Sequence, residues 1–203
     1  IRRLSVLRYP QIARDLIAYI GAREKNQVVR RAAINIAESC HIHELQGVLS
    51  AIALDISENQ HIREQAAHAI ATMGDPDTKL LLRPFILGVD GADPDQELKG
   101  CALLALWPDL ISADELFEAL VPPSHTMIAT YWSFVNYRLT QGLRDCDLPT
   151  ALKWVHDQTT PGVVYSGSFR LQDEILERAW QRIDDPEIRR GYTRCLLARN
   201  TVH

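Results

Sequence analysis

The chain has 203 residues, of which 46% are hydrophobic and 24% charged, and its net charge is −4. These values are typical of an ordinary globular protein with a substantial core and exclude a disordered or fibrous chain. Neither half is basic, which excludes the electrostatic footprint of a general nucleic-acid binder. No apolar run approaches the ~20 residues that span a bilayer, and the start lacks the layout of a signal peptide.

The four cysteines, Cys40, Cys101, Cys146 and Cys195, lie far apart and form no CxxC pair. This spacing indicates reduced thiols and therefore predicts a cytoplasmic protein. The first residue is Ile1 rather than methionine, so we interpret the chain as a fragment of a longer one.

Helical periodicity of the apolar residues predicts about eleven helices and no sheet. Residues 1–8 are predicted to end a preceding helix. Three helix pairs then follow, at 10–20 with 26–40, 43–56 with 60–73, and 77–89 with 94–106. The remaining helices are predicted at 112–121, 125–141, 148–158, 168–183 and 185–199, and the longest connection, TTPGVVYSG, at 159–167.

The stretch Asn59–Gly74 shows how these helices are built. Its apolar residues lie on one stripe that a single helix cannot bury, namely Ile62, Ala66, Ala69, Ile70 and Met73. We expect Gly74 to end this helix in a left-handed conformation. Asp75 and Pro76 are expected to cap and start the next helix.

A basic residue recurs at the same place in the second helix of each pair. Arg30, Arg63 and Lys99 are 33 and 36 residues apart, and each is followed by small or apolar residues at helical spacing. Helix pairs that repeat at this period are typical of an α-solenoid. We expect these basic residues to pair with a carbonyl or acidic residue of the neighbouring repeat rather than to line a groove. The acidic candidates are Asp55, Glu58, Asp93 and Asp95.

This pattern, seen best in Ile62-Arg63 followed by Ala66-Ala67, resembles the HEAT repeat. The resemblance implies an all-α, right-handed α-solenoid of HEAT-like helical hairpins with an irregular C-terminal third. Residues 1–123 would hold three to four helix pairs, and residues 124–203 a divergent helical continuation of the same solenoid. A narrower likeness is carried by DQELKGCALLALWPD at 95–109, LISADELF at 110–117, LERAW at 176–180 and DDPE at 184–187. These segments resemble the helical region of large bacterial proteins with a NACHT-type NTPase domain.

Four residues of the second helices are the predicted partner-binding set: Arg31, Asn35, Glu64 and His68. They fall opposite the apolar stripe, on helices that line the concave surface in a HEAT stack, although solvated helix faces have the same pattern. The function that we predict is a non-catalytic scaffold or recognition module that binds a protein or peptide. The NACHT likeness implies that the chain is the sensor or scaffold part of a larger bacterial NACHT-type signalling or defence NTPase, with further domains in the same parent chain.

Other sets of residues are less suited to a site. Cys40, His41 and His43 lack a fourth zinc ligand at a recognisable spacing, so no metal is predicted. The aromatic run Tyr131–Tyr137 has core spacing rather than the basic interleaving of a base-stacking platform. No phosphate loop, nucleophile elbow or metalloprotease helix is present, and we predict no cofactor and no enzyme activity.

Two alternatives stay open from the sequence. Some HEAT-like solenoids cradle DNA and remove damaged bases, and Trp107, Trp132 and Trp154 would suit such a groove. The acidic net charge disfavours this, because duplex affinity depends on cations that displace phosphate counterions. The other alternative is a plain structural spacer.

Overall fold

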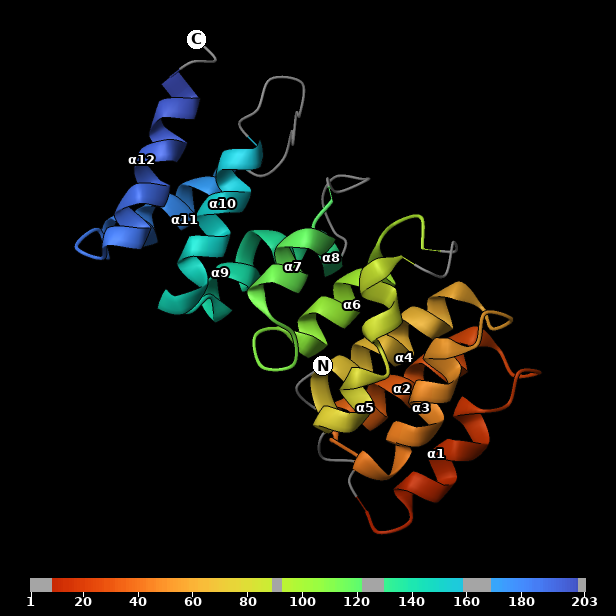
Figure 1. Cartoon of the computed structure of the whole chain (residues 1–203). Helices are drawn as coiled ribbons and strands as arrows, with labels where there is room; N and C mark the ends of the chain where they lie inside the picture. Colours follow the sequence, from red (N-terminus) through yellow and green to blue (C-terminus); the bar gives the residue numbers. More distant parts are fainter. Residues whose placement is uncertain (1–8, 89–92, 122–129, 159–168, 201–203) are drawn as a thin grey trace. The chain divides into compact units, whose positions relative to one another are not determined.

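The computed structural model describes residues 9–88, 93–121, 130–158 and 169–200, and these are helical with no β-strand (Figure 1). The all-α prediction is therefore confirmed for the described residues. The predictions for residues 1–8 and 159–167 and for the helix start at Ser168 lie outside them. The helices are α1 (Ile12–Ile20), α2 (Gln27–Ser39), η2 (His43–Leu45), α3 (Gln46–Leu54), α4 (Gln60–Met73), α5 (Pro76–Leu80), η3 (Arg83–Leu87), α6 (Glu97–Leu106), α7 (Ala113–Ala119), α8 (Thr130–Ser133), η4 (Phe134–Arg138), α9 (Leu139–Gly142), η5 (Asp145–Asp147), α10 (Leu148–Gln158), α11 (Phe169–Trp180) and α12 (Pro186–Asn200).

The chain divides into two compact units, Ile1–Leu106 and Trp107–His203. The sequence placed the change from regular repeats to a divergent continuation at residue 123, whereas the two units divide after Leu106. The reason is that α7 packs against α10, and the Thr150 hydroxyl donates to Asp114 over 3.1 Å, so α7 belongs with the second unit.

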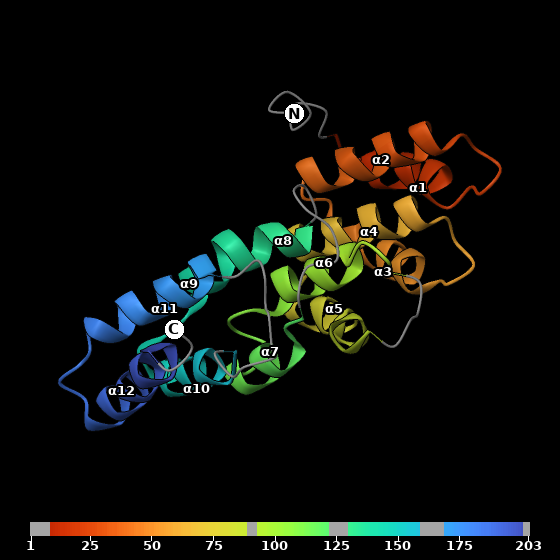
Figure 2. The ribbon, with the colours of Figure 1, turned by 90° about the horizontal axis from the view of Figure 1, so that it is seen from above.

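The first unit is built from helix pairs. Helix α1 packs on α2, α3 packs on α4, and η3 with α5 packs on α6. Helix α4 also contacts both α2 and α6, so the three second helices form a row (Figure 2). The stripe predicted from the sequence is buried between them, since Ile62, Ala66, Ala69 and Ile70 have no exposed surface.

The first helix of the third pair is shorter than predicted. A single helix over 77–89 was expected, but α5 ends at Leu80 and the 3₁₀-helix η3 begins at Arg83. Pro84 lies in the first turn of η3. Proline has no amide hydrogen and its ring clashes with the preceding turn, so an uninterrupted α-helix is disfavoured here.

The expected left-handed conformation of Gly74 is wrong. Its φ is −65° and its ψ is 148°, which is extended backbone open to any residue. A Cβ at this position would lie 2.7 Å from the Ile70 carbonyl oxygen, so the close approach of the chain to α4 excludes a side chain. The predicted cap of the next helix is confirmed, because the Asp75 carboxylate accepts the Thr78 amide over 2.8 Å.

The second unit contains the aromatic run, whose predicted helix 125–141 is described from Thr130 onward. Tyr131 and Phe134 are buried as expected, but Tyr137 is 43% exposed, and Asn136 takes the buried position. The helix passes through a π-turn at η4, which has more residues per turn than an α-helix and shifts the buried face.

The second unit is held together by side chains that bind helix ends. The Trp107 indole donates to the Leu139 carbonyl over 2.9 Å, and Arg178 donates to the carbonyls of Thr140 and Leu143. The capping box predicted at Ser112 and Glu115 is confirmed. Helix α10 packs against both α11 and α12.

Candidate functional site

Two of the repeated basic residues, Arg30 and Arg63, bind the C-terminal end of the first helix of their pair. Arg30 Nε donates to the Ile20 carbonyl over 3.0 Å, and Arg63 Nε donates to the Ala53 carbonyl over 3.1 Å. Ile20 is the last residue of α1, and Ala53 the last but one of α3. Carbonyls at a helix C-terminus lack intrahelical partners and carry partial negative charge, so a cation is favoured there.

Arg30 also joins the first pair to the second. Its Nη1 and Nη2 donate to the two carboxylate oxygens of Glu58 over 2.9 and 2.6 Å. The two side chains are 3% and 6% exposed. The hydrogen bonds from Arg30 outweigh burial and hold the pKa of Glu58 below its ordinary value. The predicted structural role of Arg30 is therefore confirmed, with Glu58 as its partner.

Arg63 and Lys99 are buried as well. The Arg63 guanidinium lies 5.9 Å from the centre of the Phe85 ring. Burial lowers the pKa of Lys99, an effect that the nearby Asp93 carboxylate opposes. Asp93 itself accepts the amides of Leu98 and Lys99 at the start of α6. All three basic residues of the repeat are therefore buried, and Arg30 borders a hollow of about 360 Å³ together with Arg23 and Glu58.

The predicted partner-binding residues lie at the surface of α2 and α4. Arg31 is exposed, while Asn35, Glu64 and His68 are partly exposed. Arg31 and Asn35 are four residues apart, as are Glu64 and His68, so each pair shares one face of its helix.

An ion pair joins these two helices. Nδ1 of His68 lies 3.1 Å from Oε1 of Glu38, and the Thr72 hydroxyl donates to the same oxygen over 3.1 Å. Glu38 is three residues after Asn35 on α2, and Thr72 is four residues after His68 on α4, so both lie on the predicted face. Helical spacing alone places Glu38 there, but its partner became visible only once α2 and α4 were seen to be adjacent.

The ion pair shifts both pKa values. The Glu38 interaction raises the pKa of His68 above 6.5 against the effect of burial. Burial raises the pKa of Glu38, but the adjacent His68 and the hydrogen bond from Thr72 outweigh it and bring that pKa below 4.5. The histidine contribution to stability is full below pH 6.5 and is lost as the pH rises through the raised pKa. The carboxylate contribution is full above pH 4.5 and is lost as the pH falls through the lowered pKa.

Helix α6 extends this surface. Glu97 lies close enough to His68 to raise its pKa, and the Cys101 thiol is 3.9 Å from the Glu64 carbonyl oxygen. Glu64 accepts from Gln60 over 2.9 Å and lies 3.1 Å from the His61 ring. We call the resulting surface the α2–α4–α6 face, which comprises Arg31, Asn35, Glu38, Glu64, His68 and Glu97.

The α2–α4–α6 face is acidic, because three carboxylates oppose one arginine and one histidine. Such a surface is suited to attract a cationic partner. The described part of the chain holds no group of three or more histidine, cysteine or acidic residues arranged for a metal ion. Of the four cysteines only Cys146 is exposed, and burial raises the pKa of Cys195 to about 11.

None of the helices in the described residues combines the length and the apolar character that crossing a membrane requires. Comparison of the chain with protein-family models, with curated proteins and with solved structures gave no match.

Proposed function

We propose that this protein is a recognition module, a right-handed HEAT-like solenoid whose α2–α4–α6 face binds a protein or peptide. The support for the solenoid is the repetition of one contact in two successive pairs, Arg30 to Ile20 and Arg63 to Ala53. In both cases the acceptor is ten residues before the arginine. Identical contacts at repeated positions are characteristic of stacked repeats, which hold neighbouring units in register.

The observation that carries the choice of partner is the run of carboxylates across three adjacent helices. Glu38, Glu64 and Glu97 come from α2, α4 and α6. Glu38 lies beside His68 and Glu64 beside His61, and the one arginine of this face is Arg31. We therefore propose a lysine- or arginine-rich segment of another protein as the ligand. The same charge disfavours duplex DNA, whose phosphates would be repelled.

The proposal extends to the context of the module. In accordance with the likeness of residues 95–109 to NACHT-type proteins, we propose that the chain is the sensor or scaffold part of a larger cytoplasmic NTPase of that class. Residues 124–203 would continue the solenoid in a divergent form. Binding of the basic segment would then control the parent protein, with the catalytic groups elsewhere.

The test is fluorescence anisotropy of the full chain with two labelled peptides of equal length, one rich in lysine and arginine and one rich in glutamate. We expect the basic peptide alone to bind, with an affinity that falls as salt is added. The double variant Glu64→Gln, Glu97→Gln should weaken binding about tenfold or more, because each carboxylate contributes an interfacial charge pair.

The matched control is Glu118→Gln, which removes an exposed carboxylate from α7 in the other unit. This variant should bind the basic peptide like the unmodified chain. Equal weakening by Glu118→Gln would mean that net charge, not the α2–α4–α6 face, attracts the peptide. A preference for the acidic peptide, or tight binding of duplex DNA in a gel shift, would overturn the proposal.

A further inference from the structure

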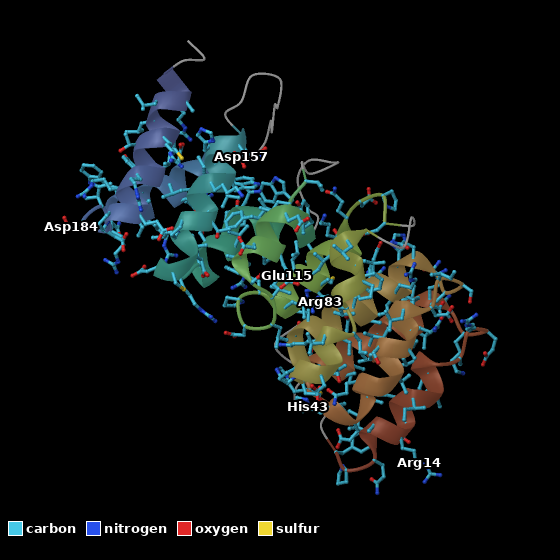
Figure 3. All side chains as sticks on the ribbon, in the orientation of Figure 1. Arg14, His43, Arg83, Glu115, Asp157 and Asp184 are labelled. Atoms are coloured by element: carbon cyan, nitrogen blue, oxygen red, sulfur yellow. The ribbon has the colours of Figure 1, made fainter. Side chains whose placement is uncertain are left out.

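The second unit contains a cleft of about 420 Å³ between α10 and α12. Its charged lining consists of Lys153, His156 and Asp157 from α10 and Glu187, Arg190 and Arg194 from α12. Asp157 is labelled in Figure 3, and the two helices lie side by side in Figure 1. A volume of this order is within the range of about 300–1,000 Å³ found for small-molecule sites.

The cleft is shaped by a close contact between the two helices. A Cβ on Gly191 would lie 3.0 Å from Cδ1 of Leu152, so α12 approaches α10 closely at this glycine. Deeper in the interface the Cys195 thiol lies 3.2 Å from the Leu152 carbonyl oxygen. Glu187 and Arg194 lie about one helical turn on either side of Gly191, and they surround the opening with longer side chains.

The cleft is lined by more cations than carboxylates. Within the residues that the structure describes, Lys153, Arg190 and Arg194 make no ion pair and no side-chain hydrogen bond. Elsewhere in the same unit Arg182 binds Asp145 over 2.6 Å and Arg199 binds Asp173 over 2.9 Å, whereas the exposed Arg189 makes no ion pair with the described residues. Three neighbouring like charges repel one another, and a bound anion would relieve that repulsion.

The acidic residues of the lining offset only part of this positive charge. The Asp157 carboxylate lies 3.2 Å from Nδ1 of His156, its neighbour on α10. Glu187 is exposed at the start of α12 and, in the described part of the chain, pairs with no cation. Three cations thus share the cleft with two carboxylates, Asp157 and Glu187, so the lining carries an excess of positive charge.

We propose that this cleft binds a small anion of the diphosphate type. The guanidinium groups of Arg190 and Arg194 are four residues apart on one helix face. They are able to bind separate phosphate groups, because each presents parallel N–H donors. Lys153 supplies a third positive charge from the opposite wall of the cleft. A ligand with a single carboxylate would leave this charge unpaired. This site lies in a different unit from the α2–α4–α6 face, so its test does not depend on the proposed function.

The test is isothermal titration calorimetry of the full chain with inorganic pyrophosphate, inorganic phosphate and ADP. We expect saturable binding of pyrophosphate that weakens as salt rises, and weaker binding of phosphate. Tighter binding of ADP than of pyrophosphate would identify the diphosphate of an organic molecule as the ligand. Equal or weaker binding of ADP would identify the inorganic anion.

Substitutions then locate the site. Arg190→Gln and Arg194→Gln should each weaken pyrophosphate about tenfold, as expected for the loss of a charge-assisted bidentate contact. Glu187→Gln should tighten it, since the substitution removes a repulsive charge from the rim. Arg189→Gln is the matched control, because Arg189 is exposed on the same helix but does not line the cleft.

The control variant should bind pyrophosphate like the unmodified chain. Loss of affinity in Arg189→Gln equal to that in Arg190→Gln would show a general effect of positive charge and overturn the proposal. So would the absence of saturable binding at millimolar pyrophosphate, or an affinity that Glu187→Gln leaves unchanged.

Discussion

Replacement of Arg30 by methionine tests the reasoning about the repeat most directly. The side chain of Arg30 is 3% exposed and makes three hydrogen bonds, one to the Ile20 carbonyl and two to Glu58. Methionine retains the aliphatic stem but removes the charge and all the donors. The Glu58 carboxylate, itself 6% exposed, would then remain buried without its main partner.

The expected loss of stability depends on the hydrogen-bond and charge partners that Glu58 keeps. Removing one partner of a buried ion pair costs about 3–5 kcal/mol. The Asn59 amide still donates to Glu58 over 2.7 Å, and Arg23 still lies 3.7 Å away, which places the loss near the lower limit. We therefore expect Arg30→Met to lower the free energy of unfolding by about 3 kcal/mol. The double variant Arg30→Met, Glu58→Leu should be less destabilised, because the unpaired carboxylate is gone.

The assay is urea unfolding followed by circular dichroism, with Arg31→Met as the control. Arg31 is the next residue but is exposed, so its loss should change stability by no more than about 0.5 kcal/mol. Arg30 holds the pKa of Glu58 below 4.5, so the difference between Arg30→Met and the unmodified chain should shrink as the pH falls through that lowered pKa. Equal stability of Arg30→Met and Arg31→Met at pH 7 would refute the reasoning.

Three further predictions concern other parts of the chain. Gly142→Ala should lower the free energy of unfolding by about 2 kcal/mol in thermal unfolding, because the new Cβ would lie 2.8 Å from Cδ1 of Trp107. Gly47→Ala is the control and should not destabilise, since a Cβ there meets nothing within 4 Å. Equal losses of stability in the two variants would contradict the close packing of Gly142 on Trp107. Glu38→Gln should lower the melting temperature most between pH 4.5 and 6.5, where the carboxylate and its histidine partner are both charged, and a pH-independent loss would contradict the ion pair. Iodoacetamide should label Cys146 alone in the native chain, as read by mass spectrometry, since the other thiols are buried.

Local signals in the sequence determined most of the helices. The asparagine before α4, the aspartate before α5 and the capping box at Ser112 each act within one turn, so their effect is visible without the fold. The apolar stripe of α4 likewise identified the buried residues, because a helix places every third or fourth residue on the same face.

Three local features differ from the prediction, for reasons that the spacing of the apolar residues does not show. The π-turn at Phe134–Arg138 exposed Tyr137 and buried Asn136. Pro84 divided a predicted helix into α5 and η3. Gly74 is required by the proximity of the Ile70 carbonyl rather than by a left-handed backbone.

The tertiary structure decided which acidic residue lies beside each basic residue. Sequence reasoning offered Arg30 several acidic residues and proposed Arg31, Asn35, Glu64 and His68 as a surface. Only the adjacency of α2 and α4 singled out Glu58 for Arg30 and Glu38 for His68. The cleft between α10 and α12 had no signal at all in the sequence, because its cations come from helices that are distant along the chain. Capping and periodicity act over a few residues, whereas ion pairs and clefts depend on which helices pack together.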